Sequence, residues 1–420
     1  MFETISMIGL GYIGLPTATL FASRKKKVIG VDVNQHAVDT INQGKIHIVE
    51  PELDVLVQKA VADGWLRATT QPEAADAFLI AVPTPFKDGH QPDLSYIESA
   101  AKAIAPVLDK GDLVVLESTS PVGATEQMAV WLAEARPDLT FPQQAGENAD
   151  VQVAHCPERV LPGQVVRELV TNDRVIGGMT QKASEMAVAL YKTFVEGDCI
   201  VTNARTAEMC KLTENSFRDV NIAFANELSM ICDKQGINVW ELIALANRHP
   251  RVNILQPGAG VGGHCIAVDP WFIVAGNPDE AKIIRAAREI NDYKPEWVID
   301  KVKAAITDVL ASKAGSTIAD IKVACLGLAF KPDIDDLRES PALSVVQKLA
   351  DSGVQVFAVE PNINKLPEKI HKSNIELLNL KDAVFTADVI VFLVKHKQFF
   401  EIKEELADKL IVDAIGLLHG

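Results

Sequence analysis

Short apolar segments alternate with stretches of helical periodicity through the first 200 residues. The apolar segment 4–8 precedes a glycine-rich turn, a helical pattern follows at residues 15–23, and residues 27–33 are apolar again. Similar short segments, typical of strands buried on both faces, occur at residues 77–82, 113–117, 152–156 and 174–177. This alternation predicts a doubly wound α/β domain built on a parallel sheet.

A different pattern begins at about residue 203. Residues 204–236 have helical periodicity without proline, and Gly236 stands where that helix would end. Residues 280–311 predict a second long helix, in which Pro295 is the position of an expected break. The segment 203–312 is therefore expected to form a central helical domain.

Strand–helix alternation returns after a short linker at residues 313–317. Apolar segments at residues 322–327, 354–359, 389–394 and 410–413 predict the strands of a second, smaller α/β domain. We therefore expect three domains, at residues 1–202, 203–312 and 313–420, in which two Rossmann-like doubly wound domains are joined by a helical one.

Composition narrows the classes of function. Of the 420 residues, 48% are hydrophobic and 23% charged, as in globular proteins, and the formal net charge is −15. That charge disfavours nucleic acid and anionic membranes as partners, whereas a few arginines can still bind an anionic small molecule. The N-terminus lacks a basic signal region and no apolar run reaches the roughly 18 residues of a membrane span, so we expect a cytoplasmic protein.

A glycine-rich turn after the first apolar segment has the spacing of a dinucleotide site. Gly9, Gly11 and Gly14 form GxGxxG, which allows a tight turn, close approach of a pyrophosphate and close packing of the next helix. Asp32 at the end of the second strand would accept hydrogen bonds from ribose hydroxyls, which favours NAD over NADP. The alternative is a glycine-rich turn that binds nothing.

Two threonine-containing turns also follow predicted strands. Thr84 lies between two prolines, and Thr119 belongs to the segment Ser-Thr-Ser-Pro-Val-Gly at residues 118–123. The carboxyl edge of an open α/β sheet is where ligands bind, although ordinary hydrogen bonding within turns explains these threonines equally well.

The six cysteines are scattered without a CxxC pair, so we expect neither a disulfide framework nor a bound metal. Cys265 alone lies in a glycine-rich loop, residues 258–270, where backbone amides can approach a ligand. Such a thiol is a nucleophile if charges or dipoles favour the thiolate, and otherwise a small buried hydrophobe. The adjacent His264 would either activate the thiol or bond to the backbone.

Several polar groups accompany this loop. Lys211, Asn215 and Arg218 share one face of the first long helix, which is either functional or simply solvated. The remaining candidates follow predicted strands or precede the glycine loop, and each is also compatible with a solvated turn. They are Glu158, Arg159, His249, Arg251, Phe330, Lys331 and Arg338.

These motifs, in this order, resemble the UDP-glucose/GDP-mannose dehydrogenase family over essentially the whole chain. The similarity is carried by GLGYIGLP, VPTP, STSPVG, CPERVLPG, AEMCKLTENSFRDVNIAFANEL, HPRVNILQPGAGVGGHCIAVDP and GLAFKPDIDDLRESPA. The resemblance implies that the first domain holds NAD, the central domain forms a homodimer, and the third helps to hold UDP.

The resemblance also implies roles for individual residues. Cys265 would be the nucleophile, with Lys211 as the acid–base or oxyanion residue. Asn215 and Asp269 would support them, and Glu158 and Thr119 would assist the water that releases the product. The implied NAD contacts are Gly9, Gly11, Tyr12, Ile13, Gly14, Asp32, Thr84, Thr125 and Arg338. The implied substrate contacts are Arg159, Val160, Lys211, Asn215, Arg218, His249, Arg251, Gly262, Phe330 and Lys331.

The activity implied is a four-electron oxidation of a UDP-sugar at C6, for bacterial surface polysaccharide. His264 and the Ala-Val-Asp at residues 267–269 stand where the UDP-glucose branch tends to have Ser and Pro-Lys-Asp. This favours an N-acetylhexosamine, with UDP-N-acetyl-D-mannosamine as the expected substrate. UDP-N-acetylglucosamine and UDP-glucose are alternatives, and a nucleotide-sugar epimerase that retains NAD and a non-catalytic NAD sensor are rivals of other classes.

Overall fold

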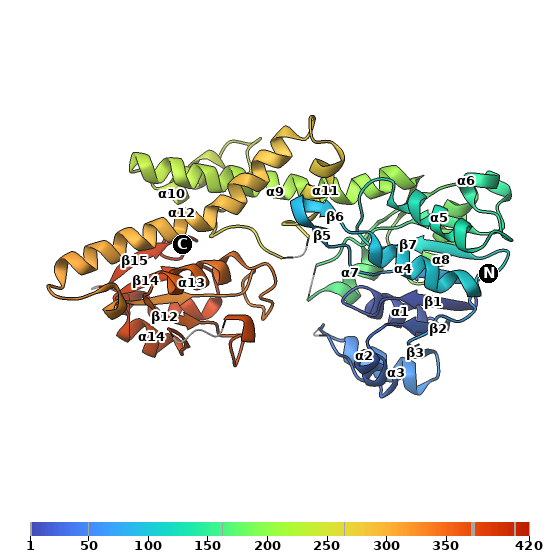
Figure 1. The fold of residues 1–420 in the computed structure, drawn as a ribbon, viewed down its shortest axis with the longest axis horizontal. Helices are drawn as coiled ribbons and strands as arrows, with labels where there is room; N and C mark the ends of the chain where they lie inside the picture. The colour runs from blue at the N-terminus through green and yellow to red at the C-terminus, as the bar shows by residue number, and fades with distance from the viewer. Residues whose placement is uncertain are drawn as a thin grey trace. The chain divides into compact units, whose positions relative to one another are not determined.

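The computed structural model describes residues 2–48, 50–161, 163–263, 265–370, 374–406 and 409–419. It divides into two compact units, Met1–Glu214 and Asn215–Gly420. Each unit contains a parallel or mostly parallel sheet covered by helices (Figure 1). The predicted α/β class with two doubly wound sheets is therefore confirmed.

The first unit is built on an eight-stranded sheet in the order β10-β9-β8-β7-β4-β1-β2-β3. Its strands are β1 (Thr4–Ile8), β2 (Lys27–Val31), β3 (Leu66–Thr69), β4 (Ala77–Ile80), β7 (Leu113–Leu116), β8 (Gln152–His155), β9 (Arg174–Gly178) and β10 (Cys199–Asn203); β5 (Phe86–Lys87) and β6 (Gln91–Pro92) form a separate hairpin. All neighbouring strands of the large sheet pair in parallel except β8 and β9, which are antiparallel.

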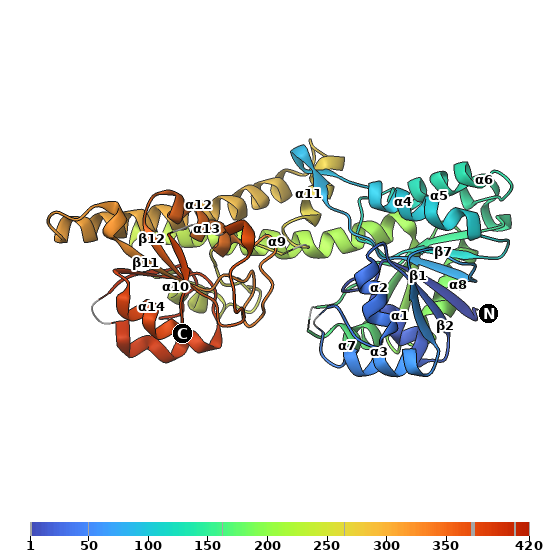
Figure 2. The same cartoon turned by 60° about the horizontal axis from the view of Figure 1, so that its bottom comes forward.

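Alternate residues of these strands pack into two separate hydrophobic cores, one on each face of the sheet. On β4, Leu79 packs with α1, α3, α7 and α8, whereas Phe78 and Ile80 pack with α4 and α5. Figure 2 shows α4 and α5 on one side of the sheet and α1 and α3 on the other. The helices of this unit are α1 (Gly14–Ser23), α2 (Gln35–Asn42), α3 (Leu53–Ala62), α4 (Ser95–Ile104), α5 (Ala124–Ala135), α6 (Pro142–Ala145), α7 (Val165–Thr171) and α8 (Gln181–Tyr191). Both faces of the sheet are buried, which explains the continuous apolar strands of the sequence.

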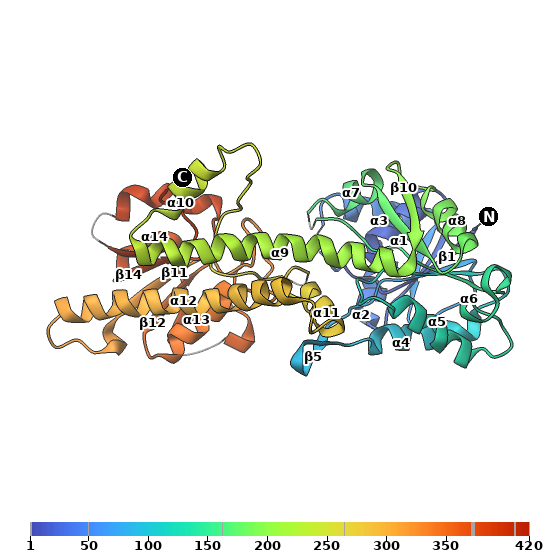
Figure 3. The same cartoon turned by 90° about the horizontal axis from the view of Figure 1, so that it is seen from above.

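The second unit combines long helices with a five-stranded parallel sheet in the order β13-β12-β11-β14-β15. Helix α9 (Ala204–Gln235) starts in the first unit and continues into the second, where it runs beside α12 (Lys282–Ser312) (Figure 3). The other elements are α10 (Val239–Ala246), α11 (Asp269–Gly276), β11 (Lys322–Leu326), α13 (Pro341–Asp351), β12 (Gln355–Val359), β13 (Ile375–Leu377), α14 (Leu380–Thr386), β14 (Val389–Phe392) and β15 (Leu410–Asp413).

Three local expectations need correction. The strand expected at residues 27–33 ends at Val31, because the side chains of Asp32 and Asn34 bond the turn that starts α2. The sheet of the first unit is not wholly parallel, since β9 runs against β8. Helix α12 continues through Pro295, whose ring would lie 3.1 Å from a Cβ placed on Gly260, so tertiary packing holds the helix where its sequence predicts a break.

Two glycines of the turn after β1 differ in how much space surrounds them, and this difference predicts the effects of substituting them. A Cβ on Gly14 would lie 1.8 Å from the carbonyl oxygen of Gly9, whereas a Cβ on Gly11 would meet nothing within 4 Å. We expect Gly14→Ala to lower the free energy of unfolding by roughly 1–3 kcal/mol or more through overpacking. Gly11→Ala should unfold as the unsubstituted protein does. Urea denaturation of both variants measures this, and equal midpoints would contradict it.

Candidate functional site

The turn between β1 and α1 forms a cradle with a carboxylate beside it. Gly9 has a φ of +91°, and its amide donates to the carbonyl of Val31 at 2.8 Å. The carboxylate of Asp32 accepts the amide of Leu10 at 2.9 Å, which fixes the acid at the end of β2 beside the turn. The open face of Gly11 leaves room for a ligand to approach the backbone.

The start of α1 completes this cradle. Gly14 is the first helical residue, Ile13 precedes it, and Tyr12 is 39% exposed. Unbonded amides at a helix N-terminus attract phosphate. A bare backbone, a helix N-terminus and a fixed carboxylate together fit a dinucleotide whose ribose lies against Asp32.

The predicted threonine turns are bonded to each other. The hydroxyl of Thr84 donates to the carbonyl of Thr119, and Ser118 both donates to the carbonyl of Val82 at 2.7 Å and accepts its amide at 2.9 Å. The loops after β4 and β7 are therefore joined at the carboxyl edge of the sheet. These contacts are turn hydrogen bonds, and the roles of Thr84 towards NAD and of Thr119 towards water stay predictions.

Thr125 at the start of α5 is bonded to a residue that sequence reasoning missed. Glu208 of α9 accepts the amide and the hydroxyl of Thr125, at 2.8 and 2.6 Å, and the amide of Gly123 at 2.6 Å. Burial raises the pKa of Glu208 above its usual value, partly offset by these hydrogen bonds. Glu208 lies inside one of the motif blocks, but only the fold reveals its partners 83–85 residues away.

Two candidate catalytic groups meet in the first unit. Lys211 of α9 and Glu158, three residues beyond β8, are both largely buried, and their Nζ and Oε1 atoms lie 3.4 Å apart. The other oxygen of Glu158 accepts the amide of the half-buried Val160 at 2.9 Å. The structure thus brings together a cation and an acid that the sequence separates by 53 residues.

Arg159 lies at the edge of the same segment. Its guanidinium forms an ion pair with Glu214 at 2.6 Å and donates to the carbonyl of Asp173 at 3.2 Å. Arg159 also lines a pocket. Its lining residues are Pro157, Arg159, Val160, Glu168, Leu169, Asn172, Asp173 and Arg174.

Cys265, in the second unit, is exposed. Cys156 of the first unit and Cys232 and Cys325 of the second are buried. Burial raises the pKa of Cys156 to about 11 and that of Cys325 to about 12, so those thiols stay protonated at neutral pH. Exposure of Cys265 is the property a nucleophile requires. The expectation for His264 lies outside the described residues.

The segment after Cys265 is fixed by buried polar contacts. The carbonyl of Cys265 accepts the amide of Asp269 at 2.8 Å, and the carboxylate of Asp269 accepts the amide group of Asn215 at 2.5 Å. Asn215 and Asp269, both buried, therefore tie α9 to the start of α11, as the implied supporting roles require.

The segment before Cys265 is held by a second missed residue, Asn226. Its side-chain oxygen accepts the amide of Gly258 at 2.9 Å, while its amide group donates to Asn291 at 2.9 Å. Arg288, buried and paired with Asp219 at 2.7 Å, reaches the carbonyl of Ile266 at 3.5 Å. Both ends of the cysteine loop are thus anchored to the α9–α12 pair.

The remaining candidates are mostly on the surface. Arg218, His249, Arg251, Lys331 and Arg338 are exposed, so the face predicted to carry Lys211, Asn215 and Arg218 is buried at the first two positions only. Arg338 is bonded to Asp336 at 2.6 Å. Gly262 lies against Phe330, where an added Cβ would be 2.9 Å from the Phe330 Cβ. Among the described residues, no group of three or more His, Cys, Asp or Glu side chains is placed to hold a metal, and no helix is long and apolar enough to cross a membrane.

The Glu208 contacts generate a second prediction. Glu208→Gln places an amide group against the amide of Gly123, so a partly buried donor loses its acceptor, and we expect a loss of about 1–3 kcal/mol in unfolding free energy. Glu126→Gln, which removes only the exposed pair with Arg205, should cost less than about 1 kcal/mol. Chemical denaturation of the two variants gives the comparison, and an equal loss would count against the buried role of Glu208.

Comparison with known proteins agrees with this arrangement. The chain matches three domains described for the UDP-glucose/GDP-mannose dehydrogenase family: the NAD binding domain at residues 3–195, the central domain at 205–293 and the UDP binding domain at 324–420. A relative from Yersinia pestis, the UDP-N-acetyl-D-mannosamine dehydrogenase, is 69% identical over 421 residues and covers 99% of each chain.

Two further matches extend the comparison. The NDP-N-acetyl-D-galactosaminuronic acid dehydrogenase of Ralstonia nicotianae is 64% identical, over 99% of this chain and 96% of the relative. The solved structure of UDP-D-ManNAc dehydrogenase from Pyrococcus horikoshii is 39% identical, with a TM-score of 0.86 over 99% of this chain and 96% of that one. With all three family domains matched in order, the chain belongs to the UDP-glucose/GDP-mannose dehydrogenase family.

Proposed function

We propose that the protein oxidises UDP-N-acetyl-D-mannosamine at C6 to UDP-N-acetyl-D-mannosaminuronate, with NAD as the electron acceptor. The substrate is supported by the 69% identity to a relative named for that sugar. The chemistry is supported by Cys265, which is the only one of the six cysteines, all of them described, that is exposed. We further propose that the product serves bacterial surface polysaccharide and that the enzyme works in the cytoplasm, which suits a reactive thiol.

In this proposal the first domain supplies all the cofactor contacts except Arg338. Gly9, Gly11 and Gly14 accommodate its pyrophosphate at the start of α1, Asp32 accepts its ribose hydroxyls, and Tyr12, Ile13, Thr84, Thr125 and Arg338 complete the contacts. When bound, NAD supplies the two-electron acceptor for each of two oxidations. The domain boundaries we propose remain 1–202, 203–312 and 313–420.

Cys265 solves the problem posed by the second oxidation. A free aldehyde has no alcohol hydrogen to surrender, whereas its thiohemiacetal with the cysteine sulfur does, and the covalent bond also retains the aldehyde. Oxidation of that adduct gives a thioester, and water then releases the carboxylate and restores the thiol. Four electrons leave the sugar, so two NADH form per sugar.

Other side chains have proposed parts in this reaction sequence. Lys211 balances negative charge on the substrate oxygen, and Asn215, bonded to Asp269, orients the reacting group. Glu158 and Thr119 assist the attacking water. The buried Lys211–Glu158 pair supports this division, because each group lowers the cost of the charge on the other. The substrate contacts proposed are Arg159, Val160, Arg218, His249, Arg251, Gly262, Phe330 and Lys331.

A second candidate substrate is an N-acetylgalactosamine nucleotide. It is favoured by the 64% identity to the Ralstonia relative, which is nearly as high as that to the mannosamine enzyme. UDP-N-acetylglucosamine and UDP-glucose are weaker alternatives.

We also propose a homodimer formed through α9. Phe217, Phe224 and Ile231 recur every seven residues along this helix and are 69%, 50% and 45% exposed. A stripe of large apolar side chains at that spacing lies on one helix face and is typical of a surface that pairs with another helix.

The covalent mechanism predicts the outcome of removing the thiol. Cys265→Ser should yield no uronate, because the aldehyde cannot form a thioester, whereas the unsubstituted enzyme should produce two NADH per UDP-N-acetyl-D-mannosamine. Cys199→Ser, at a half-buried cysteine of β10, serves as the control and should keep that ratio. Product analysis beside NADH absorbance measures both, and uronate at the unsubstituted yield from Cys265→Ser would refute the mechanism.

The dimer predicts a change in mass. Phe224→Glu introduces a charge at the centre of the α9 stripe and should convert the dimer to a monomer, as read by light scattering after size exclusion. Val55→Glu, at an exposed position of α3, is the matched surface control and should leave the mass unchanged. If the Phe224→Glu protein elutes at the mass of the unsubstituted dimer, the stripe is not the interface.

A further inference from the structure

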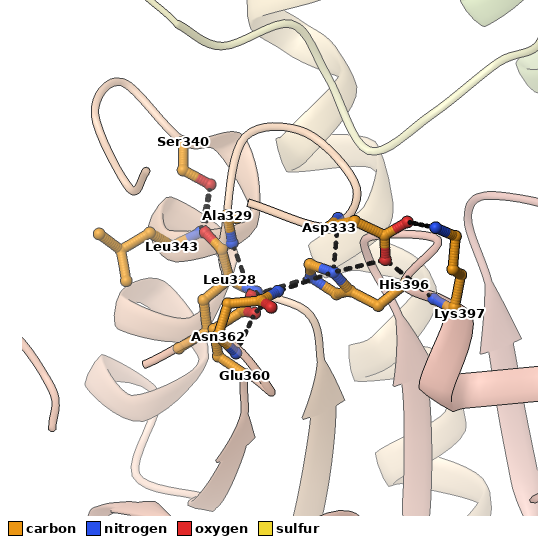
Figure 4. Close-up of polar contacts among 9 residues, drawn as sticks. All are labelled: Leu328, Ala329, Asp333, Ser340, Leu343, Glu360, Asn362, His396 and Lys397. Carbon is orange, nitrogen blue, oxygen red and sulfur yellow. Dashed lines mark hydrogen bonds and ion pairs between the residues drawn. The ribbon is translucent and has the colours of Figure 1, made fainter. Parts of the chain in front are cut away.

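The carboxyl edge of the second sheet contains a buried acid–imidazole pair. Glu360 follows β12, His396 lies beyond β14, and their side chains are 4% and 0% exposed. Nε2 of His396 and Oε2 of Glu360 are 3.0 Å apart (Figure 4). Buried charged groups are costly unless they are bonded, so the pair calls for a structural reason.

Both members bind the backbone of the segment that follows β11. The amides of Leu328 and Ala329 donate to Oε2 of Glu360 at 2.8 and 3.0 Å, and the amide of Asp333 donates to Nδ1 of His396 at 3.0 Å (Figure 4). Asp333 has a φ of +59°, a conformation that non-glycine residues adopt at a cost and that must therefore be held. The pair fixes the two ends of the segment 328–333.

These contacts determine the protonation of the pair. A backbone amide can only donate, so Nδ1 of His396 is the acceptor and Nε2 carries the hydrogen that is donated to Glu360. Burial alone would raise the pKa of Glu360, but the hydrogen bonds from His396 and the amide of Leu328 outweigh it and lower that pKa below its usual value. The carboxylate is thus ionised, and the imidazole is oriented by Glu360, by the amide of Asp333 and by the side chain of Asn362, whose Nδ2 lies 3.3 Å from Nδ1.

The segment held in this way supports the loop of the proposed nucleophile. A Cβ on Gly263 would lie 2.9 Å from the ring of Phe330, and one on Gly262 would lie 2.4 Å from the carbonyl oxygen of Glu339. Cys265 follows two residues after Gly263. The Phe330 ring is therefore the surface on which the turn before Cys265 rests.

We infer that Glu360 and His396 are positioning residues that place Phe330, and through it the Gly262–Gly263 turn, so that Cys265 is presented correctly. This inference rests on the proposed function of Cys265. It adds a function for two residues that lie 95 and 131 positions beyond Cys265 in the sequence. Displacement of a reacting group by about 1 Å can cost on the order of a hundredfold in rate, so a small shift of Phe330 is sufficient.

The experiment separates the hydrogen bond between His396 and Glu360 from the one between His396 and the amide of Asp333. In His396→Gln the side-chain amide can still donate to Glu360, but the acceptor for Asp333 is lost; in His396→Asn the carbonyl oxygen replaces Nδ1, but the donor to Glu360 is lost. We expect His396→Gln to lower kcat about tenfold or more with the KM for NAD unchanged, and His396→Asn to recover part of that loss. Alkylation of Cys265 by iodoacetamide, followed on its own peptide by mass spectrometry, should change in rate in parallel with kcat.

A matched control distinguishes positioning from simple loss of stability. Asn374 donates to the carbonyls of Ala350 in α13 and of Val354, at 2.7 and 2.9 Å. Its replacement therefore removes two hydrogen bonds from the same domain and none from the segment 328–333. Asn374→Ala should lower the melting temperature comparably and leave kcat and the alkylation rate unchanged. If His396→Gln does not fold, Glu360→Gln replaces it, because it alters the other member of the pair, and it should show the same fall in kcat and shift in alkylation.

The results can overturn the positioning role of Glu360 and His396 without overturning the proposed function. If Cys265→Ser makes uronate at the unsubstituted yield, the proposed role of Cys265 fails whatever His396 does. If Cys265 is essential but kcat and alkylation of His396→Gln match those of Asn374→Ala, the positioning inference is overturned and the proposed function stands.

Discussion

Backbone amides in the loops of both units depend on buried or half-buried side-chain acceptors supplied by distant parts of the chain. Asp32 accepts the amide of Leu10, Glu208 those of Gly123 and Thr125, Asn226 that of Gly258, and Glu360 those of Leu328 and Ala329. A loop rich in glycine has few side chains with which to hold its own shape. The external acceptors supply that rigidity to the turn after β1, to the start of α5, to the loop that contains Cys265 and to the segment after β11.

The two sheets use the same device with different results. In the first sheet, Asp32 binds one amide of the glycine turn and leaves the open face of Gly11 available to a ligand. In the second sheet, the carboxylate of Glu360 accepts two backbone amides of the corresponding loop and also bonds to His396. The protein's own side chains therefore occupy these amides. Equivalent positions in two similar domains therefore serve different purposes, one for a cofactor and one, as we infer, for support.

The sequence was sufficient for those features that local patterns encode. The bounds of strands such as β1 and β15, the span of α9 to within one residue and the glycine turn with Asp32 all follow from periodicity and spacing. The sequence did not predict that α12 continues through Pro295, because the proline ring packs near Gly260, which belongs to another part of the chain. The same limit applies to the site: Lys211 and Glu158 were each named as candidates, but their pairing across 53 residues, and the acceptors Glu208 and Asn226, exist only once the fold is formed.

The reversed direction of β9 has a consequence for how the rim of the first sheet can vary. Because β8 runs to the carboxyl edge and β9 starts from it, the connection between them, residues 156–173, begins and ends on the same side of the sheet. Glu158 and Arg159 lie in it, and the bond from Arg159 to the carbonyl of Asp173 joins its two ends. A change in the length of this connection would remodel the mouth of a binding site without altering the register of any strand, which makes it a natural place for related enzymes to acquire different sugar preferences.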